Sequence, residues 1–173
     1  MGKVNNLVYK VLLFIHPVEI VKKLLKIVLV AKEIIFHRIS YYPASVINFE
    51  KKFASYIGKN FGLTFCNGTS SIEAALFALK INKGDEVLVP SCTFHASIDP
   101  IVNLGAIPVF VDVNPNNLIM CLIDLTAKIS KKTKCITVVH PFGYVANMEE
   151  ISKIAKDYGL VILEDVSHAH GAK

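Results

Sequence analysis

The sequence predicts an α/β fold in three layers, with a mostly parallel β-sheet covered by helices. From residue 46 onward, short apolar runs alternate with segments in which apolar residues recur every three or four positions. This alternation of strand and helix patterns is typical of a parallel sheet with helical crossovers. The 173 residues and the 53% apolar content are ample for the core of one domain.

The first predicted element of this region is a helix over Asn48–Tyr56. Phe49, Phe53 and Tyr56 recur at the spacing of one helix face, and Gly58 follows as a stop. We therefore expect a helix at the start of the α/β region.

A strand over Leu63–Cys66 and a second helix come next. The strand leads into Asn67-Gly68-Thr69-Ser70-Ser71, and the helix continues to about Leu79. The residues expected on its inner face are Ile72, Ala75, Leu76 and Leu79.

Four further strands complete a predicted sheet of five. They are expected over Glu86–Val89, Ile107–Val111, Cys135–Val139 and Leu160–Leu163. Between them we expect three helices: one ending near Gly105, one over roughly Asp124–Ser130 and one over Met148–Tyr158. The residues of the last helix expected to face inward are Met148, Ile151, Ala155 and Tyr158.

Residues 1–45 read as a separate helical extension, and residues 46–173 as the α/β domain. The extension is hydrophobic and basic, but lysines and Pro17 interrupt its apolar runs. None approaches the ~20 apolar residues that a membrane-spanning helix needs, and a short apolar run without a small-residue cleavage site argues against a signal peptide. Residues 20–36 form an amphipathic pattern, which fits a helix packed on the domain or a second subunit, and also a helix lying on an anionic membrane surface.

Charge and cysteine spacing exclude several classes. Residues 1–36 carry +4 of the net charge of +5, and no nucleic-acid-binding motif accompanies this charge, so a nucleic-acid partner is not expected. The four cysteines form no C-x-x-C pair, which argues against a zinc or redox site. Unpaired cysteines in apolar segments suit a reducing, cytoplasmic setting.

The segment Asn67–Ser71 lies where a strand passes into a helix. Backbone N–H groups and hydroxyls at a helix N-terminus can bind a phosphate. Ser70 and Glu73 also match a capping box, which would satisfy those N–H groups internally. The segment matches neither the P-loop nor the G-x-G-x-x-G pattern, so a nucleoside triphosphate or NAD is disfavoured.

Candidate side chains follow the strand ends. Phe94 can cover a planar ligand or belong to the core, and Asp165 can pair with a protonated ring nitrogen or serve as a cap. Opposite charges 4 Å apart attract by about 4 kcal/mol at an effective dielectric constant of 20, enough to keep such a nitrogen protonated. His168 suits a hydrogen bond to a ligand better than a metal site, because no further metal ligand lies nearby in sequence. His140 follows its strand at the same edge.

Taken together, the residues from about Ser40 to Lys173 resemble the DegT/DnrJ/StrS-type family of pyridoxal-phosphate-dependent sugar aminotransferases. The matching segments, in chain order, are Phe49–Gly58, Asn67–Ser70, Gly84–Phe94, Gly105–Val113, Val139–Gly143 and Glu164–Ala172. Their order and spacing together make the resemblance specific, and it covers the first part of a longer family member.

The resemblance implies the large domain of a fold-type-I enzyme and a site for pyridoxal 5'-phosphate. By resemblance, Thr69 and Ser70 hold the cofactor phosphate, and Phe94 stacks on the pyridine ring. Asp165 pairs with the ring nitrogen, and His168 approaches the phenolic oxygen.

The implied reaction moves an amino group from glutamate or glutamine to a keto-sugar, often nucleotide-linked, or to a keto-cyclitol. Family members are homodimers. Their Schiff-base lysine lies beyond the end of this chain, so the chain alone is expected to be inactive and to contain no catalytic residue. The alternatives are a related sugar dehydratase, in which histidine replaces that lysine, and a non-catalytic protein that acts at a membrane surface.

Overall fold

The structure is a computed structural model that describes residues 43–172. The expectations for residues 1–42, including the amphipathic helix over 20–36, lie outside the described residues. The chain divides into two compact units, one ending at Gly62 and the other beginning at Leu63.

The described part of the first unit is built on helix α3 (Ala44–Tyr56), which confirms the first predicted helix and begins a turn earlier. Phe49 and Phe53 stack with ring centroids 5.6 Å apart, as their spacing predicts. The chain then folds back along the helix. A Cβ at Gly62 would lie 2.8 Å from the carbonyl oxygen of Glu50, so only glycine permits this approach.

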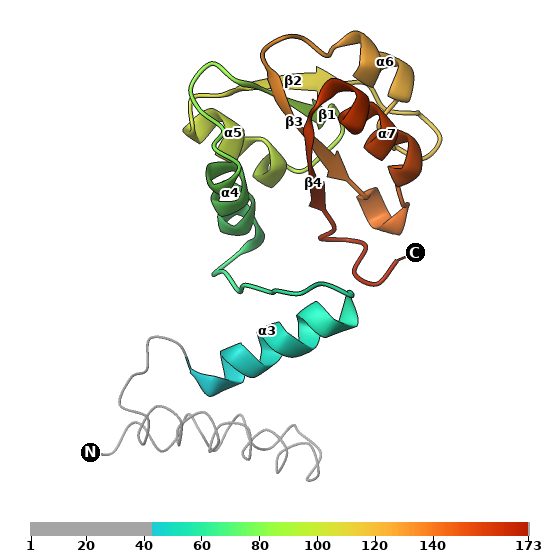
Figure 1. Cartoon of the computed structure of the whole chain (residues 1–173). Helices are drawn as coiled ribbons and strands as arrows, with labels where there is room; N and C mark the ends of the chain where they lie inside the picture. Colours follow the sequence, from blue (N-terminus) through green and yellow to red (C-terminus); the bar gives the residue numbers. More distant parts are fainter. Residues whose placement is uncertain (1–42, 173) are drawn as a thin grey trace, which may run out of the picture. The chain divides into compact units, whose positions relative to one another are not determined.

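The second unit holds a four-stranded parallel sheet, which confirms the predicted fold class (Figure 1). Its strands are β1 (Glu86–Pro90), β2 (Ile107–Val111), β3 (Thr133–Val139) and β4 (Val161–Asp165), in the order β2-β1-β3-β4. Its helices are α4 (Gly68–Ala78), α5 (Asp99–Asn103), α6 (Leu122–Ala127) and α7 (Met148–Tyr158), with short 3-10 turns η1 (His95–Ser97) and η2 (Pro141–Gly143).

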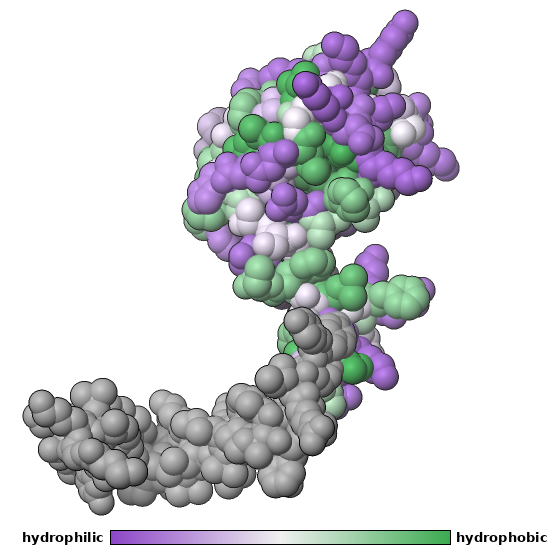
Figure 2. Space-filling view, turned by 90° about the vertical axis from the view of Figure 1, so that its left-hand side faces the viewer, coloured by the Kyte–Doolittle hydropathy of each residue, from purple (hydrophilic) through white to green (hydrophobic). Residues whose placement is uncertain are grey.

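The sheet separates two apolar cores because alternate strand residues point to opposite faces. Val87 and Val89 of β1 pack with residues of α4 and α5, whereas Leu88 packs with residues of α6 and α7. Both faces of the sheet are therefore covered, as a parallel sheet requires. On the face that Figure 2 shows, hydrophilic side chains cover much of this unit, with hydrophobic ones between them.

The predicted strand over Leu63–Cys66 is wrong, since these residues belong to no strand. A strand is stabilised by hydrogen bonds to a neighbour, and no strand of residues 43–172 pairs with this segment. Its apolar side chains are correspondingly exposed, with Leu63 at 74%.

Two finer expectations about the helices also need correction. Ile151 and Ala155 of α7 are buried as predicted, but Tyr158, the last residue of the helix, is half exposed because the chain turns away at Gly159. Helix α6 covers Leu122–Ala127 rather than Asp124–Ser130. Asp124 lies in its first turn, where its carboxylate accepts from the N–H of Asp112 and from Lys128.

No helix among residues 43–172 is both long and apolar enough to cross a membrane.

The hydroxyl of Thr137, on β3, is buried without a hydrogen-bond partner among the described residues. A buried polar atom that lacks a partner destabilises the folded state. We expect Thr137→Val to raise the free energy of unfolding in urea by about 1 kcal/mol. Thr133, on the same strand, is the control, because its hydroxyl accepts from the N–H of Ser130. Thr133→Val should lower that free energy by about 1 kcal/mol, and equal effects of the two substitutions would contradict the assignment.

Cys135 should be unreactive in the folded protein. Burial raises the pKa of its thiol to about 12, whereas Cys66 and Cys92 are exposed. Because the thiolate is the reactive form, iodoacetamide at neutral pH should modify Cys66 and Cys92 and leave Cys135 intact until urea unfolds the chain. Mass spectrometry of tryptic peptides measures this order, and early labelling of Cys135 would show that the core is open.

Candidate functional site

The carboxyl ends of the parallel strands meet at one edge of the sheet, where the winding direction reverses. From β1 the chain runs through α5 to β2, at one edge of the sheet. From β3 it runs through α7 to β4, at the other edge. The helices of these two crossovers cover opposite faces of the sheet. The loops after β1 and β3 therefore diverge and leave a crevice, which is where open α/β sheets bind ligands.

A cavity of about 430 Å³ occupies this crevice. That volume lies within the range of small-molecule sites. Its lining residues come from the first turns of α4, from the last residues of β3 and β4, and from the segments that follow β1, β3 and β4. They are Gly68, Ile72, Cys92, Thr93, Phe94, Ala96, Val139, His140, Pro141, Phe142, Asp165, Ser167 and His168. Three of the predicted residues, Phe94, Asp165 and His168, thus share one cavity.

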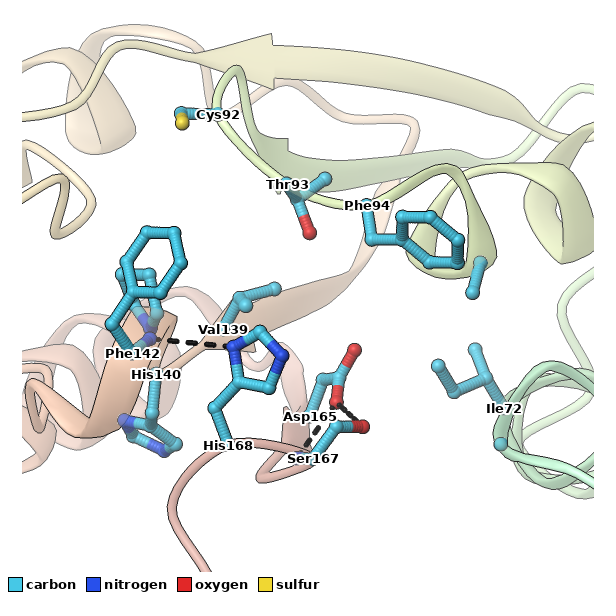
Figure 3. A pocket seen from close by; sticks show the side chains of 13 residues that line it. Ile72, Cys92, Thr93, Phe94, Val139, His140, Phe142, Asp165, Ser167 and His168 are labelled. Carbon is cyan, nitrogen blue, oxygen red and sulfur yellow. Dashed lines mark hydrogen bonds between the residues drawn. The ribbon is translucent and has the colours of Figure 1, made fainter.

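Asp165 lies at the end of β4, between His168 and Ile72, with Thr93 and Phe94 across the cavity (Figure 3). One carboxylate oxygen accepts from Ser97 Oγ at 2.8 Å. The other accepts from the Ser167 N–H at 3.1 Å and from the Ser167 hydroxyl. A carboxylate has about four acceptor positions, so these bonds fix its orientation and leave room for a further donor from a ligand.

Burial alone would raise the pKa of Asp165, because a half-buried site disfavours a charge. The hydrogen bonds from Ser167 and Ser97 outweigh burial and hold the pKa of Asp165 below its usual value of 3.8. Asp165 is therefore a fixed negative charge at neutral pH, as a partner for a cationic ring nitrogen must be.

His168 is oriented by the loop after β3. Its Nδ1 accepts from the backbone N–H of Phe142 at 3.3 Å, and the two rings stack with centroids 5.7 Å apart. Nδ1 is thus the unprotonated nitrogen of the neutral ring, and Nε2 carries the proton. Nε2–H is then a donor for a ligand oxygen.

Phe142, which donates this hydrogen bond to His168, has an unusual backbone conformation with φ at +52°. A left-handed conformation costs a non-glycine residue about 1–2 kcal/mol. Phe142 as a whole is also 73% exposed. The surrounding structure maintains the conformation, which places the N–H of Phe142 against His168.

His140 and His95 do not serve as ligand contacts in the same way. His140 is buried, its Nδ1 accepts from Ala146 N–H at 3.0 Å, and its Nε2 lies 3.4 Å from a carboxylate oxygen of Glu164. Both of its nitrogens are thus used to attach the loop after β3 to β4. His95 pairs with Asp99 on the surface at 2.7 Å and does not line the cavity.

The N-terminus of α4 reaches the cavity through Gly68, whereas the side chains of Thr69 and Ser70 do not line it. The cap of this helix is Asn67, whose side chain accepts from Ser70 N–H at 2.8 Å, rather than the Ser70–Glu73 capping box. The N–H groups of Gly68 and Thr69 have no acceptor within residues 43–172. This helix end can therefore donate to an anion, and the roles of Thr69 and Ser70 stay a prediction.

The sequence pattern did not single out Thr93, Ser97, Phe142 or Ser167. Ser97 lies on the 3-10 turn η1, three residues after Phe94, and no local sequence pattern marks it. Phe94 itself is 67% exposed, which rules out the alternative that it belongs to the core.

The cavity thus offers an aromatic face, an ionised carboxylate, a histidine donor and a helix N-terminus, all at one edge. This set suits a flat, cationic ring that carries an oxygen and an anionic group. Within the part of the chain that the structure describes, no group of three or more His, Cys, Asp or Glu side chains could hold a metal ion.

Comparison with known proteins agrees with this geometry. Residues 37–173 match the model of the DegT/DnrJ/EryC1/StrS aminotransferase family. GDP-perosamine synthase of Escherichia coli O157:H7 is 42% identical over 72% of this chain and 34% of its own length. L-glutamine:scyllo-inosose aminotransferase of Streptomyces griseus is 38% identical over 72% of this chain and 29% of its own length.

A solved aminotransferase from Psychrobacter cryohalolentis has the same fold, with a TM-score of 0.78 and 35% identity over 83% of this chain and 37% of that one. The chain spans about a third of the length of the curated relatives it matches.

Asp165 should make the free energy of unfolding depend on pH under acidic conditions. Its folded pKa lies below 3.8, so the unfolded chain takes up this proton at a higher pH than the folded chain. The stabilisation is therefore complete above the unfolded pKa and is lost as the pH falls through the folded pKa. We expect Asp165→Asn to be less stable than the wild type at pH 7, with a difference that shrinks below pH ~4. Urea midpoints against pH measure this, and a constant difference would contradict it.

Proposed function

Because the chain belongs to the DegT/DnrJ/EryC1/StrS aminotransferase family, as the sequence resemblance indicated, we propose that its cavity holds pyridoxal 5'-phosphate for amino-group transfer. The observation that carries this proposal is the ionised, hydrogen-bonded Asp165, which lines the same cavity as the aromatic ring of Phe94.

The residues present fit this cofactor. The carboxylate of Asp165 has an acceptor position left for a protonated pyridine nitrogen, and the lowered pKa of Asp165 keeps it charged. Such an ion pair keeps the ring nitrogen protonated at neutral pH. When bound, the protonated ring supplies an electron sink for chemistry at the carbon next to the transferred amino group.

The other lining residues hold and orient the ring. Phe94 and His168 both line the cavity, which supports the proposal that Phe94 covers one face of the ring and that the Nε2–H of His168 donates to the phenolic oxygen. The open N–H groups of Gly68 and Thr69, with the hydroxyls of Thr69 and Ser70, are the proposed phosphate site.

We propose no covalent attachment within the described part of the chain, because no lysine among residues 43–172 lines the cavity. We infer that the described residues hold the cofactor through ion pairing, stacking and hydrogen bonds alone.

The proposed substrates follow from the relatives. One is named as a GDP-sugar synthase and another as an aminotransferase of L-glutamine and a cyclitol ketone. We propose an amino-acid donor, glutamate or glutamine, and as acceptor a keto-sugar, often nucleotide-linked, or a keto-cyclitol, in a homodimeric protein of the cytoplasm.

Binding of pyridoxal phosphate tests the proposal. We expect the purified chain to change the visible spectrum of pyridoxal phosphate saturably. Asp165→Asn should weaken binding about ten- to hundred-fold, as expected for the loss of a hydrogen bond to a charged group. Asp157→Asn, on the exposed side of α7, is the matched control and should bind like the wild type.

Borohydride treatment followed by mass spectrometry extends this test. A cofactor held without a covalent bond leaves no stoichiometric adduct. An adduct on one lysine, or equal binding by Asp165→Asn and the wild type, would contradict the proposed mode of binding.

A further inference from the structure

Ser97 occupies a position that the proposed function does not explain. It is fully buried on the 3-10 turn η1, and its hydroxyl lies between two other polar side chains. Ser97 Oγ is 2.8 Å from a carboxylate oxygen of Asp165 and 3.1 Å from Thr93 Oγ1.

Counting protons fixes the direction of both hydrogen bonds. The ionised carboxylate of Asp165 can only accept, so the single hydroxyl proton of Ser97 points to it. In the hydrogen bond between Ser97 and Thr93, the hydroxyl of Thr93 must therefore be the donor and Ser97 Oγ the acceptor. The three residues form a directed relay in which Thr93 donates to Ser97 and Ser97 donates to Asp165.

This relay joins parts of the sheet that do not touch directly. Thr93 and Ser97 follow β1, whereas Asp165 ends β4, and β3 lies between these strands. Phe94 stands between Thr93 and Ser97 in the chain and lines the same cavity. The relay therefore attaches the loop that carries the aromatic wall to the carboxylate on the other side of the crevice.

We propose that Ser97 is a positioning residue that orients the Asp165 carboxylate and fixes its spacing to Phe94. The proposal rests on the proposed function, in which Asp165 meets the ring nitrogen and Phe94 covers the ring. Without the relay, the carboxylate keeps its bonds from Ser167 but loses the only described donor to its second oxygen.

A second consequence concerns ionisation. The Ser97 bond is one of the contacts that lower the pKa of Asp165. If the Ser97 hydroxyl had a purely structural role, its removal would leave the pKa of the Asp165 carboxyl unchanged. Its removal therefore has a signature separate from any loss of folding.

Carboxyl ¹³C NMR of the full chain without cofactor tests the relay directly, with Asp165→Asn used to assign the signal. We expect Ser97→Ala to raise the carboxyl pKa of Asp165. Ser130→Ala is the matched control, because Ser130 also donates to a carboxylate, that of Glu86, but lies outside the cavity. The control should leave the Asp165 signal unchanged.

Thr93 gives a second, independent pair of variants. Thr93→Val removes the hydroxyl and keeps the shape, whereas Thr93→Ser keeps the donor. We expect Thr93→Val to raise the carboxyl pKa less than Ser97→Ala does, and Thr93→Ser to restore the wild-type value. This pair keeps the proposal testable if Ser97→Ala does not fold.

Titration with pyridoxal phosphate links the relay to binding. Ser97→Ala should bind about tenfold more weakly than the wild type, as expected for one lost charge-assisted hydrogen bond. An unchanged carboxyl pKa in Ser97→Ala, or binding as tight as in the wild type, overturns the proposal. A raised pKa in a chain that binds no pyridoxal phosphate supports the relay and refutes the proposed function instead.

Discussion

Parallel pairing of β1, β3 and β4 is the constraint on which the site depends. Thr93, Phe142 and Asp165 lie far apart in the sequence. They line one cavity because parallel strands bring all their carboxyl ends to the same edge of the sheet. The reversal of winding between β1 and β3 then opens a crevice at that edge. The apolar cores on both faces stabilise the sheet, and the cavity is a consequence of the strand order rather than of any one loop.

Within this frame, Asp165 decides the chemistry of the cavity. A carboxylate that is half buried without donors would take up a proton more readily, and it could not act as a fixed counter-charge. Ser97 and Ser167 prevent this by donating to both of its oxygens. The charge is therefore prepared before a ligand enters, and pre-organisation of this kind avoids the free-energy cost of rearranging the site on binding.

Much of the fold and of the candidate site was predictable from the sequence, and the predictions that failed did so for physical reasons. Four apolar strands and the position of Asp165 at a strand end follow from local patterns, and Phe94, Asp165 and His168 do meet in one cavity. The prediction of a strand at Leu63–Cys66 was wrong because a strand needs a neighbouring strand to pair with, and local sequence does not reveal whether one is present. Ser97 was missed because its partner is 68 residues away, so only the fold shows that its hydroxyl is buried against a carboxylate.

The histidines show why residue type alone is a poor guide to role. His140 and His168 both lie at the cavity. Both ring nitrogens of His140 have a protein partner, whereas Nε2 of His168 has none among residues 43–172. The difference arises in the loop after β3, where the N–H of Phe142, at φ +52°, donates to His168 and the N–H of Ala146 donates to His140. One short loop therefore fixes one histidine as part of the scaffold and leaves the other as a donor, at the expense of one strained residue.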